Sequence, residues 1–353
     1  MTKPYMALFV HWDAVIKLEQ IRDTGKTVHG TVSNLKDFYK VLSSHGDSEH
    51  MITKKLYERL KKLYPKRERR IGGNAGNAAV ALAELDIPCV ISCPLRPKGL
   101  MQTLARFGIR VVNRGKDVMP VKVIKDDPEI EHLVFECGQN RKIFVWDPFA
   151  QRLMLDQDFW ESVRNTNMLF LSGFHVVDYR YRKKVDYIAD LLEDRTFKTH
   201  LELGQGTETM VYAWRKLLNR NCIDSLGLSE YELDIIGLYS KDLEDVKEYL
   251  RLFLDKYGLE RIALHTEDYR LTVTRGDLKK NLKAARYSSL VACAKSMGSI
   301  KENLEKAKGF TSGFKSQKER DLFIIPTNKN PDPKIVTGLG DTAAVVDALI
   351  SLV

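Results

Sequence analysis

The segment from residue 335 to residue 347, IVTGLGDTAAVVD, carries the residue types that phosphoryl transfer needs. Gly338, Leu339 and Gly340 precede a helical pattern, so their backbone N–H groups would lie at a helix start, where free N–H groups and the helix dipole stabilise an anion. Asp341 would repel a phosphate there unless it accepts the proton of a hydroxyl that attacks phosphorus. The alternative is a glycine turn with Asp341 as a helix cap, and this segment alone favours that alternative.

A second glycine-led segment, GGNAGNAA, occupies residues 72–79. Gly73 would let the backbone approach a ligand. Asn74 and Asn77 could form hydrogen bonds with sugar hydroxyls, although for Asn74 a helix cap explains the residue equally well. No Lys-Ser/Thr pair follows the glycines and their spacing is not that of a dinucleotide fingerprint, so two common phosphate-binding loops are excluded.

Carboxylates follow several apolar segments. Asp13 comes after the first of them and could accept hydrogen bonds from two sugar hydroxyls, although by itself it indicates only a turn. His200 and Glu202 would share one face of a strand. Glu202 could bind Mg²⁺ directly or through water, and its apolar neighbours disfavour an exposed edge strand. Glu232 is a second candidate, with a helix-start charge as the alternative.

Apolar segments and helical patterns alternate along most of the chain, which predicts an α/β fold with a doubly wound parallel sheet flanked by helices on both faces. We expect strands or helices over residues 5–10, 74–85, 87–95, 168–172, 199–203, 244–257, 261–266 and 322–326. Ligands of such sheets bind beyond the carboxyl ends of the strands. These ends would hold Asp13, Gly173, Gly204, His265 and Thr266.

Two regions depart from this alternation and predict a smaller lid domain. Residues 15–70 are highly charged and mostly helical in period, and residues 105–150 contain alternating segments typical of strands exposed on one face. The large nucleotide-binding domain would then consist of residues 1–14, 71–104 and 151–353.

The composition is that of an ordinary globular protein, with 44% hydrophobic and 29% charged residues. No apolar run is long enough to span a bilayer, and the N-terminus does not resemble a signal peptide. Five scattered cysteines without a Cys-x-x-Cys pair favour free thiols in the cytoplasm. The net charge of +9 would suit nucleic acid, but no recognition motif accompanies it, so a solvated basic surface is the favoured interpretation.

Six motifs occur in a characteristic order: GGNAGNAA, Ser172-Gly173, His200-x-Glu202, DSLGLSEYEL at 224–233, LHTEDY at 264–269 and TGLGDT at 337–342. In this order the chain resembles the ADP-dependent sugar kinases, the archaeal-type glucokinases and phosphofructokinases of the ribokinase superfamily. The resemblance runs from LFVHWDA at 8–14 to the last helix, and it implies a ribokinase-like fold with a smaller α/β lid.

The resemblance also implies roles for the matching residues. Asp341 would be the general base, with Gly338, Leu339 and Gly340 as the anion-binding backbone. Asp13, Gly73, Asn74 and Asn77 would contact the sugar, His265 and Thr266 the nucleotide, and Glu202 and Glu232 would organise Mg²⁺. The implied partners are ADP and a small carbohydrate.

The chain departs from the family pattern at Ser229, where members usually have Asn, which bears on how firmly the metal is organised. It is also shorter than typical members, which points to a different substrate. Arg141 and a basic run with Arg180 and Arg182 suggest an acceptor that carries a phosphate. The alternatives are an ATP-dependent carbohydrate or nucleoside kinase and a non-catalytic basic protein that binds ligands or nucleic acid. The sequence leaves the acceptor and the oligomeric state open.

Overall fold

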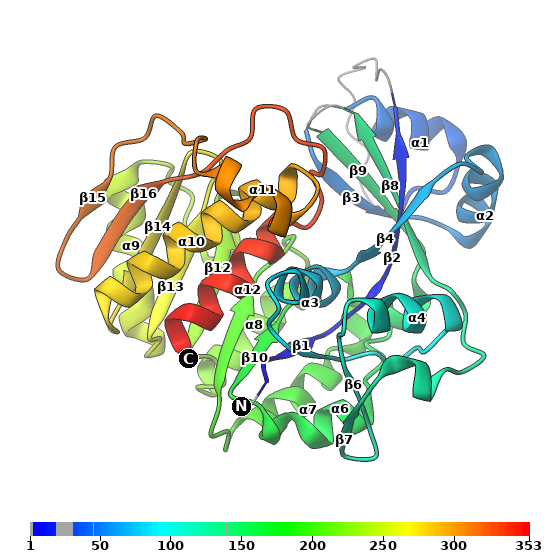
Figure 1. The fold of residues 1–353 in the computed structure, drawn as a ribbon, viewed down its shortest axis with the longest axis horizontal. Helices are drawn as coiled ribbons and strands as arrows, with labels where there is room; N and C mark the ends of the chain where they lie inside the picture. The colour runs from blue at the N-terminus through cyan, green and yellow to red at the C-terminus, as the bar shows by residue number, and fades with distance from the viewer. Residues whose placement is uncertain (1–2, 19–30, 45, 138–139) are drawn as a thin grey trace.

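The computed structural model describes residues 3–18, 31–44, 46–137 and 140–353. Its largest element is a nine-stranded sheet in the order β15-β16-β14-β13-β12-β11-β10-β1-β5 (Figure 1). The strands are, in chain order, β1 Tyr5–Ala7, β5 Val90–Ile91, β10 Met168–Leu171, β11 Lys198–Glu202, β12 Ser225–Ser229, β13 Arg261–His265, β14 Tyr269–Thr274, β15 Gln317–Lys318 and β16 Leu322–Pro326.

The six strands from β5 to β13 are parallel, as the sequence predicts, but β14, β16 and β15 are antiparallel. The sheet is therefore mixed. A short turn after β13 causes this difference, because the Thr266 N–H bonds to the Tyr269 carbonyl at 3.0 Å and the chain returns beside the strand it left. A parallel return would need a much longer crossover.

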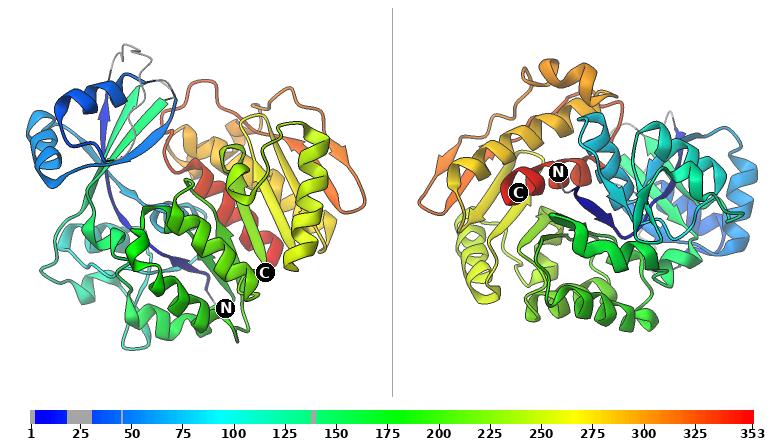
Figure 2. Two further views of the ribbon diagram at one scale, coloured as in Figure 1. Left: turned by 180° about the vertical axis from the view of Figure 1, so that it is seen from behind. Right: turned by 60° about the horizontal axis from the view of Figure 1, so that its bottom comes forward.

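Helices cover both faces of this sheet (Figure 2). One face carries α3 Asn74–Glu84, α10 Leu278–Ser296, α11 Ile300–Ala307 and α12 Leu339–Leu352, and the other carries α7 Lys183–Leu192, α8 Glu208–Asn219 and α9 Leu243–Tyr257. Strand β10 shows how the sequence builds both cores. Met168 and Phe170 pack on the α3 and α12 side, whereas Leu169 and Leu171 pack on the α7 and α8 side.

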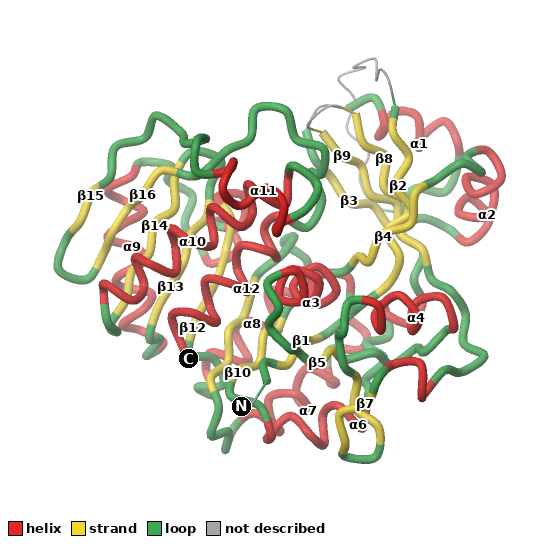
Figure 3. Tube along the Cα trace, in the orientation of Figure 1, coloured by secondary structure: helices red, strands yellow, loops and turns green. Residues whose placement is uncertain are grey.

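A second sheet of five strands lies beside the first, in the order β3-β9-β8-β2-β4 (Figure 3). Its strands are β2 His11–Lys17, β3 Ser48–Met51, β4 Glu68–Gly72, β8 Glu131–Cys137 and β9 Asn140–Val145. Helices α1 Leu35–Leu42 and α2 Lys54–Leu63 pack on it through a separate core that includes Phe38, Leu60, Phe135 and Phe144. The chain passes between this small domain and the large one where β1 leads into β2, where β4 leads into α3, before β8 and after β9.

The residues that form the small domain differ from those that the sequence predicts. The boundary expected after residue 14 falls inside β2, and residues 15–70, expected to be mostly helical, also supply β3 and β4. Part of the expected insertion at 105–150 belongs to the large domain. There β6 Val111–Asn113 and β7 Lys116–Val118 form a hairpin, and the Tyr5 hydroxyl donates to Asp117 at 3.2 Å.

Two further expectations differ from the structure. Within residues 105–150, expected to form strands, Pro120–Val123 is instead a 3₁₀ turn, because Pro120 has a φ suited to a helical first turn and offers no N–H to a sheet. The strand expected over 87–95 is limited to β5. The remaining helices are α4 Lys98–Arg106, α5 Pro148–Gln151 and α6 Gln157–Ser162. None of the described helices has the length and apolar character needed to cross a membrane.

Candidate active site

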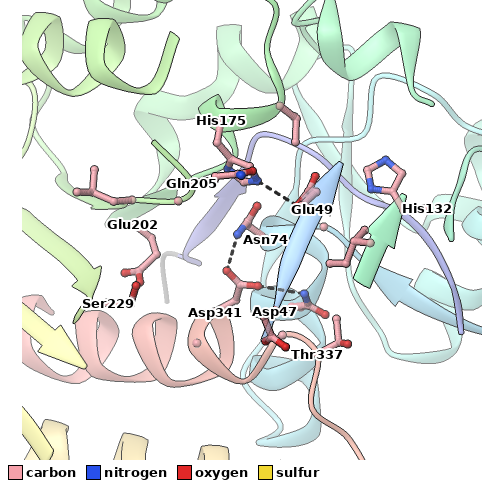
Figure 4. A pocket seen from close by; sticks show the side chains of 18 of the residues that line it. Asp47, Glu49, Asn74, His132, His175, Glu202, Gln205, Ser229, Thr337 and Asp341 are labelled. Carbon is pink, nitrogen blue, oxygen red and sulfur yellow. Dashed lines mark hydrogen bonds and ion pairs between the residues drawn. The ribbon is translucent and has the colours of Figure 1, made fainter. Parts of the chain in front are cut away.

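A cavity of about 540 Å³ lies between the two sheets, at the carboxyl ends of the parallel strands. Both domains line it, and Figure 4 shows their side chains facing one another across it. The large domain contributes Asn74, Asn77, His175, Glu202, Glu232 and Asp341, and the small domain contributes His11, Asp13, Asp47, Glu49, His132 and Arg141.

Helix α12 begins at this cavity, as the glycine motif predicts. Gly338 is its N-cap and adopts a left-handed φ of 73°. A side chain at Gly338 would also collide with Asn77, because a Cβ there would lie 2.4 Å from the Asn77 side chain. The first turn of α12 therefore presents its backbone N–H groups close to the Asn77 amide, and such groups favour a negative charge.

Asp341 lies in this first turn and is held by two amides. Asn74 Nδ2 donates to Asp341 Oδ1 at 2.7 Å, and Asn77 Nδ2 donates to Oδ2 at 3.0 Å (Figure 4). Asp341 does not cap the helix, because Gly338 occupies the cap position. Burial raises the pKa of Asp341 above its ordinary value, although the two amides act in the opposite direction. A carboxylate with a raised pKa is a better proton acceptor, provided it stays ionised.

The other predicted acceptor contacts surround Asp341. Gly73 caps α3 with a φ of 78°, and a Cβ there would lie 2.6 Å from the Phe9 carbonyl oxygen. Asp13 lies in β2 of the second sheet and is buried beside His11 Nε2 at 3.4 Å. The structure thus brings Asp13, Gly73, Asn74 and Asn77 to one cavity.

Arg180 and Arg182 do not lie at this site, in contrast to the sequence-based hypothesis. The Arg180 side chain is 82% exposed and pairs with Asp178 at 2.6 Å, and the Arg182 guanidinium lies over the Tyr179 ring. Neither arginine lines the cavity, nor does the 3₁₀ segment Tyr179–Tyr181 that contains Arg180 and precedes Arg182. Arg141 does reach the cavity, where it pairs with Asp47 at 3.2 Å and donates to the Val336 carbonyl at 3.2 Å.

Glu202 and Glu232 form the acidic side of the cavity. Glu202 is buried between two histidines, 3.0 Å from His200 Nε2 and 3.6 Å from His265 Nε2. Burial raises the pKa of Glu202 well above its usual range, and the charges of Glu232 and Asp341 add to this effect. Burial also raises the pKa of Glu232. Such mutually unfavourable carboxylates are stabilised by a bound cation.

Ser229 holds Glu232 through a capping box. The Ser229 N–H donates to Glu232 Oε2 at 2.7 Å, and the Ser229 side chain accepts from the Glu232 backbone. Ser229 therefore positions Glu232. Members of the family that the chain resembles usually have Asn at this position. Because Glu202 and Glu232 are already engaged by protein donors, they fit Mg²⁺ held partly through water, which is how this ion is often bound.

A second cavity, of about 310 Å³, adjoins the first at the start of α12. His265, Ser229, Tyr231 and Gly340 line both cavities, and Thr266 and Arg270 line the second. Burial and the nearby Arg270 lower the pKa of His265 to about 3, so this imidazole is neutral. The predicted nucleotide contacts His265 and Thr266 thus lie together in the second cavity, and His265 also lines the first.

Several residues of the site carry no recognisable sequence signal. Glu49 and His175 come from different domains and approach to 3.7 Å across the cavity, and His11 stacks on His132 with ring centroids 3.5 Å apart. Glu49 lies in a charged stretch, which predicts an exposed segment. His132 lies in a segment where apolar and polar residues alternate, which predicts a strand but no site. Only the position of His11 beside Asp13 could have pointed to it.

Comparisons with known proteins agree with this geometry. Residues 12–344 match the family profile described as the ADP-specific phosphofructokinase/glucokinase conserved region. An ADP-dependent glucose/glucosamine kinase from Pyrococcus furiosus is 24% identical, over 78% of this chain and 74% of the relative.

Two solved structures share the fold. A hypothetical ADP-dependent phosphofructokinase from Pyrococcus horikoshii superposes with a TM-score of 0.76 at 18% identity, covering 99% of this chain and 98% of that one. An ADP-dependent kinase in complex with fructose-6-phosphate and ADPβS gives a TM-score of 0.72 at 17% identity, covering 99% and 94%. Because the profile covers nearly the whole chain, this protein belongs to the ADP-specific phosphofructokinase/glucokinase family, a group of phosphotransferases with a ribokinase-like fold.

Proposed function

We propose that the protein transfers a phosphoryl group from ADP to a hydroxyl of a sugar or sugar phosphate, with Asp341 as the general base. The observation that carries this proposal is the position of Asp341. It lies on the first turn of α12, where an acceptor-sized cavity meets a second cavity that contains the predicted nucleotide contacts. A hydroxyl on one side and a phosphate on the other would meet at this helix start.

In this mechanism Asp341 takes the hydroxyl proton as the oxygen approaches phosphorus. Asn74 and Asn77 hold both carboxylate oxygens and so fix the direction of the proton acceptor. The free N–H groups of the α12 first turn stabilise the charge on the transferred group. The small domain covers the cavity and limits access of water, which would otherwise compete as acceptor.

Mg²⁺ is the cofactor that we propose, held by Glu202 and Glu232 in part through water. When bound it would neutralise charge on the phosphate oxygens. Support comes from the raised pKa of both carboxyls. The charge of the buried Arg270 acts in the opposite direction and lowers the pKa of Glu202.

ADP is the proposed donor and ATP the alternative within the same fold. The curated relative is named for ADP, and the related kinase structure contains an ADP analogue. We also propose a cytoplasmic location, which the four free, buried cysteines Cys89, Cys93, Cys222 and Cys293 support.

For the acceptor, the cavity favours an uncharged sugar, with a phosphorylated sugar as the second candidate. Arg141 is the one lysine or arginine among the described lining residues, and Asp47 already pairs with it. Asp13 and Glu49 would repel a phosphate at that end. The phosphorylated acceptor is favoured by Arg141 itself and by the fructose-6-phosphate in the related kinase structure.

The basic surface argues against the alternative of a non-catalytic protein that binds ligands or nucleic acid. Part of the basic run near α2 is committed to a buried carboxylate, because Lys61, Arg67 and Arg69 all pair with Glu131, which is fully buried. These cations stabilise the small domain and are less available to nucleic acid.

A matrix of ADP and ATP against sugars and their phosphate esters, read by product formation, tests the proposal. We expect turnover with ADP and a free sugar, unchanged by Arg180→Ala or Arg182→Ala, which serve as matched controls for Arg141→Ala. Turnover only with ATP would show instead that the protein is an ATP-dependent kinase of the same fold. Salt-sensitive binding to nucleic acid without any turnover would contradict the kinase assignment.

A further inference from the structure

A buried arginine lies between β14 and α12, and the mechanism above gives it no contact with a substrate. Arg270 is the second residue of β14, and the next residue, Leu271, belongs to the core on the α7, α8 and α9 side of the sheet. Because side chains alternate along a strand, Arg270 lies on the opposite face, where α12 packs. Arg270 is only 4% exposed, yet it lines the second cavity.

Two arginines share one carboxylate beneath α12. Arg261 Nη2 donates to Asp347 Oδ2 at 2.7 Å, whereas Arg270 Nη2 lies 3.8 Å from the same oxygen, too far for a hydrogen bond. Among the residues that the structure describes, no other carboxylate pairs with Arg270, and its guanidinium donates no hydrogen bond. An arginine does not lose its proton in a protein, so Arg270 is a buried cation without a close anion of its own.

The described lining of the second cavity contains no other buried cation. Lys329 is the only other lysine or arginine in this lining, and its side chain is 41% exposed and pairs with Glu267 at 2.6 Å. A phosphate that enters a buried site needs charge-assisted hydrogen bonds. Arg270 has N–H groups free to donate them, and its planar guanidinium fits two oxygens of one phosphate.

The cavity linings indicate which phosphate of the donor Arg270 would meet. Gly340, at the start of α12, lines both cavities, whereas Arg270 lines only the second. In the proposed reaction the transferred phosphoryl group crosses from one cavity to the other at this helix start. The phosphate that stays with the nucleoside remains in the second cavity, on the side of Arg270.

We propose that Arg270 binds the α-phosphate of the nucleoside diphosphate donor and stabilises the charge that this group gains as it leaves. The inference rests on the proposed kinase function. In the transfer, the acceptor oxygen forms a bond to the β-phosphorus and its proton passes to Asp341. The bond from the β-phosphorus to the bridging oxygen breaks, and its electron pair stays on the leaving nucleoside monophosphate, where Arg270 donates hydrogen bonds.

Calorimetry of the full chain with adenosine, AMP and ADP tests this contact without any turnover. Arg270→Met keeps the apolar part of the side chain and removes its charge. It should weaken the binding of AMP and of ADP about 10- to 100-fold and leave adenosine binding unchanged. Arg275→Met is the matched control, because Arg275 follows β14 at the surface, where it pairs with Asp255, and this variant should bind all three ligands like the unmodified protein.

Arg270→Lys keeps the test decisive if Arg270→Met does not fold. Lysine retains the charge but lacks the planar fork, so AMP and ADP affinity should fall by a smaller factor, again with adenosine binding unchanged. Unchanged AMP affinity in the folded variant, a loss confined to ADP, or an equal loss for adenosine would each overturn the contact with the α-phosphate. Normal turnover in that variant would leave the kinase function standing, whereas an unmodified protein that binds no nucleotide would overturn both proposals.

Discussion

Asp341 is oriented by two amides that act on different oxygens of its carboxylate. Asn74 and Asn77 both lie on α3 and are one helical turn apart, so they reach the carboxylate from the same side. Burial raises the pKa of Asp341 and the amides lower it, and the net effect is a raised pKa. The residue combines higher basicity with a fixed direction, which is what proton removal from a positioned hydroxyl requires.

Loss of one amide should change how the enzyme depends on pH. In Asn74→Ala the charged carboxylate loses a donor, so the pKa of Asp341 rises further. Because Asp341 must be ionised to act, the acid limb of the kcat–pH profile should move to higher pH. Asn219→Ala, at the exposed end of α8, is the control. If the acid limb of the profile does not move in Asn74→Ala, Asp341 is not the group that accepts the proton.

The two glutamates make a second prediction at the residue scale. Burial raises the pKa of both carboxyls, the charge of Asp341 adds to the effect on each, and the charge of Glu232 adds to that on Glu202, as expected for a cation site. Glu202→Gln and Glu232→Gln should each require more Mg²⁺ for half-maximal turnover, with partial recovery at high Mg²⁺. Glu208→Gln, an exposed glutamate at the start of α8, should titrate like the unmodified protein. If both site variants have unchanged Mg²⁺ titrations, Glu202 and Glu232 do not bind the metal.

At the scale of elements, three contacts tie the small domain to the segments that carry the site. Glu49 on β3 pairs with His175 at 3.7 Å, and Arg141 on β9 donates to the Val336 carbonyl. The Thr337 hydroxyl donates to Glu136 on β8 at 3.2 Å. Two of the three involve the loop that leads into α12, so we expect closure of the small domain and placement of Asp341 to be coupled.

The pair between Glu49 and His175 predicts that closure weakens at higher pH. Burial lowers the pKa of His175, but Glu49 outweighs it, with smaller contributions from Glu232 and Asp341, and the pKa is raised. The pKa of Glu49 is about 2, so it stays ionised. Closure is therefore favoured below about pH 6.5, the ordinary histidine pKa, and this contribution is lost as the pH rises through the raised value.

The acceptor KM should accordingly increase above about pH 6.5. Glu49→Gln should flatten this dependence, and Glu58→Gln on the exposed face of α2 should not. Small-angle scattering at the two pH extremes measures closure directly. Identical pH profiles for the unmodified protein and Glu49→Gln would show that the pair does not control closure.

Elements with strong local signals could be predicted from the sequence, and the others could not. Helix α9 follows from its apolar face and from Gly258, which ends it with a φ of 63°. The start of α12 follows from its two glycines. In contrast, β2 and β4 lie in charged sequence, and their pairing joins residues far apart in the chain. Local periodicity does not report such contacts, so the predicted bounds of the lid domain do not follow the strands of the second sheet.

At the scale of the molecule, the site depends on bringing together two domains and distant segments. Glu202 and His265 meet because the parallel strands β11 and β13 end at one edge of the large sheet, whereas Asp13 comes from β2 of the second sheet and Asn74 and Asp341 from the first turns of α3 and α12. Arg180 and Arg182 follow such a strand end too, but an intervening 3₁₀ turn carries them outward. The direction of that turn decides which basic side chains face the cavity. The composition of the sequence does not reveal this direction.

The general-base role of Asp341, on which the whole molecular arrangement converges, is tested most directly by Asp341→Asn. Asparagine keeps the size of the side chain but cannot remove a proton at the same rate. Single-turnover kinetics and ADP calorimetry on the same preparation separate chemistry from binding. We expect unchanged nucleotide affinity and a loss in turnover of about a hundredfold or more. Near-normal turnover in this variant would contradict this role.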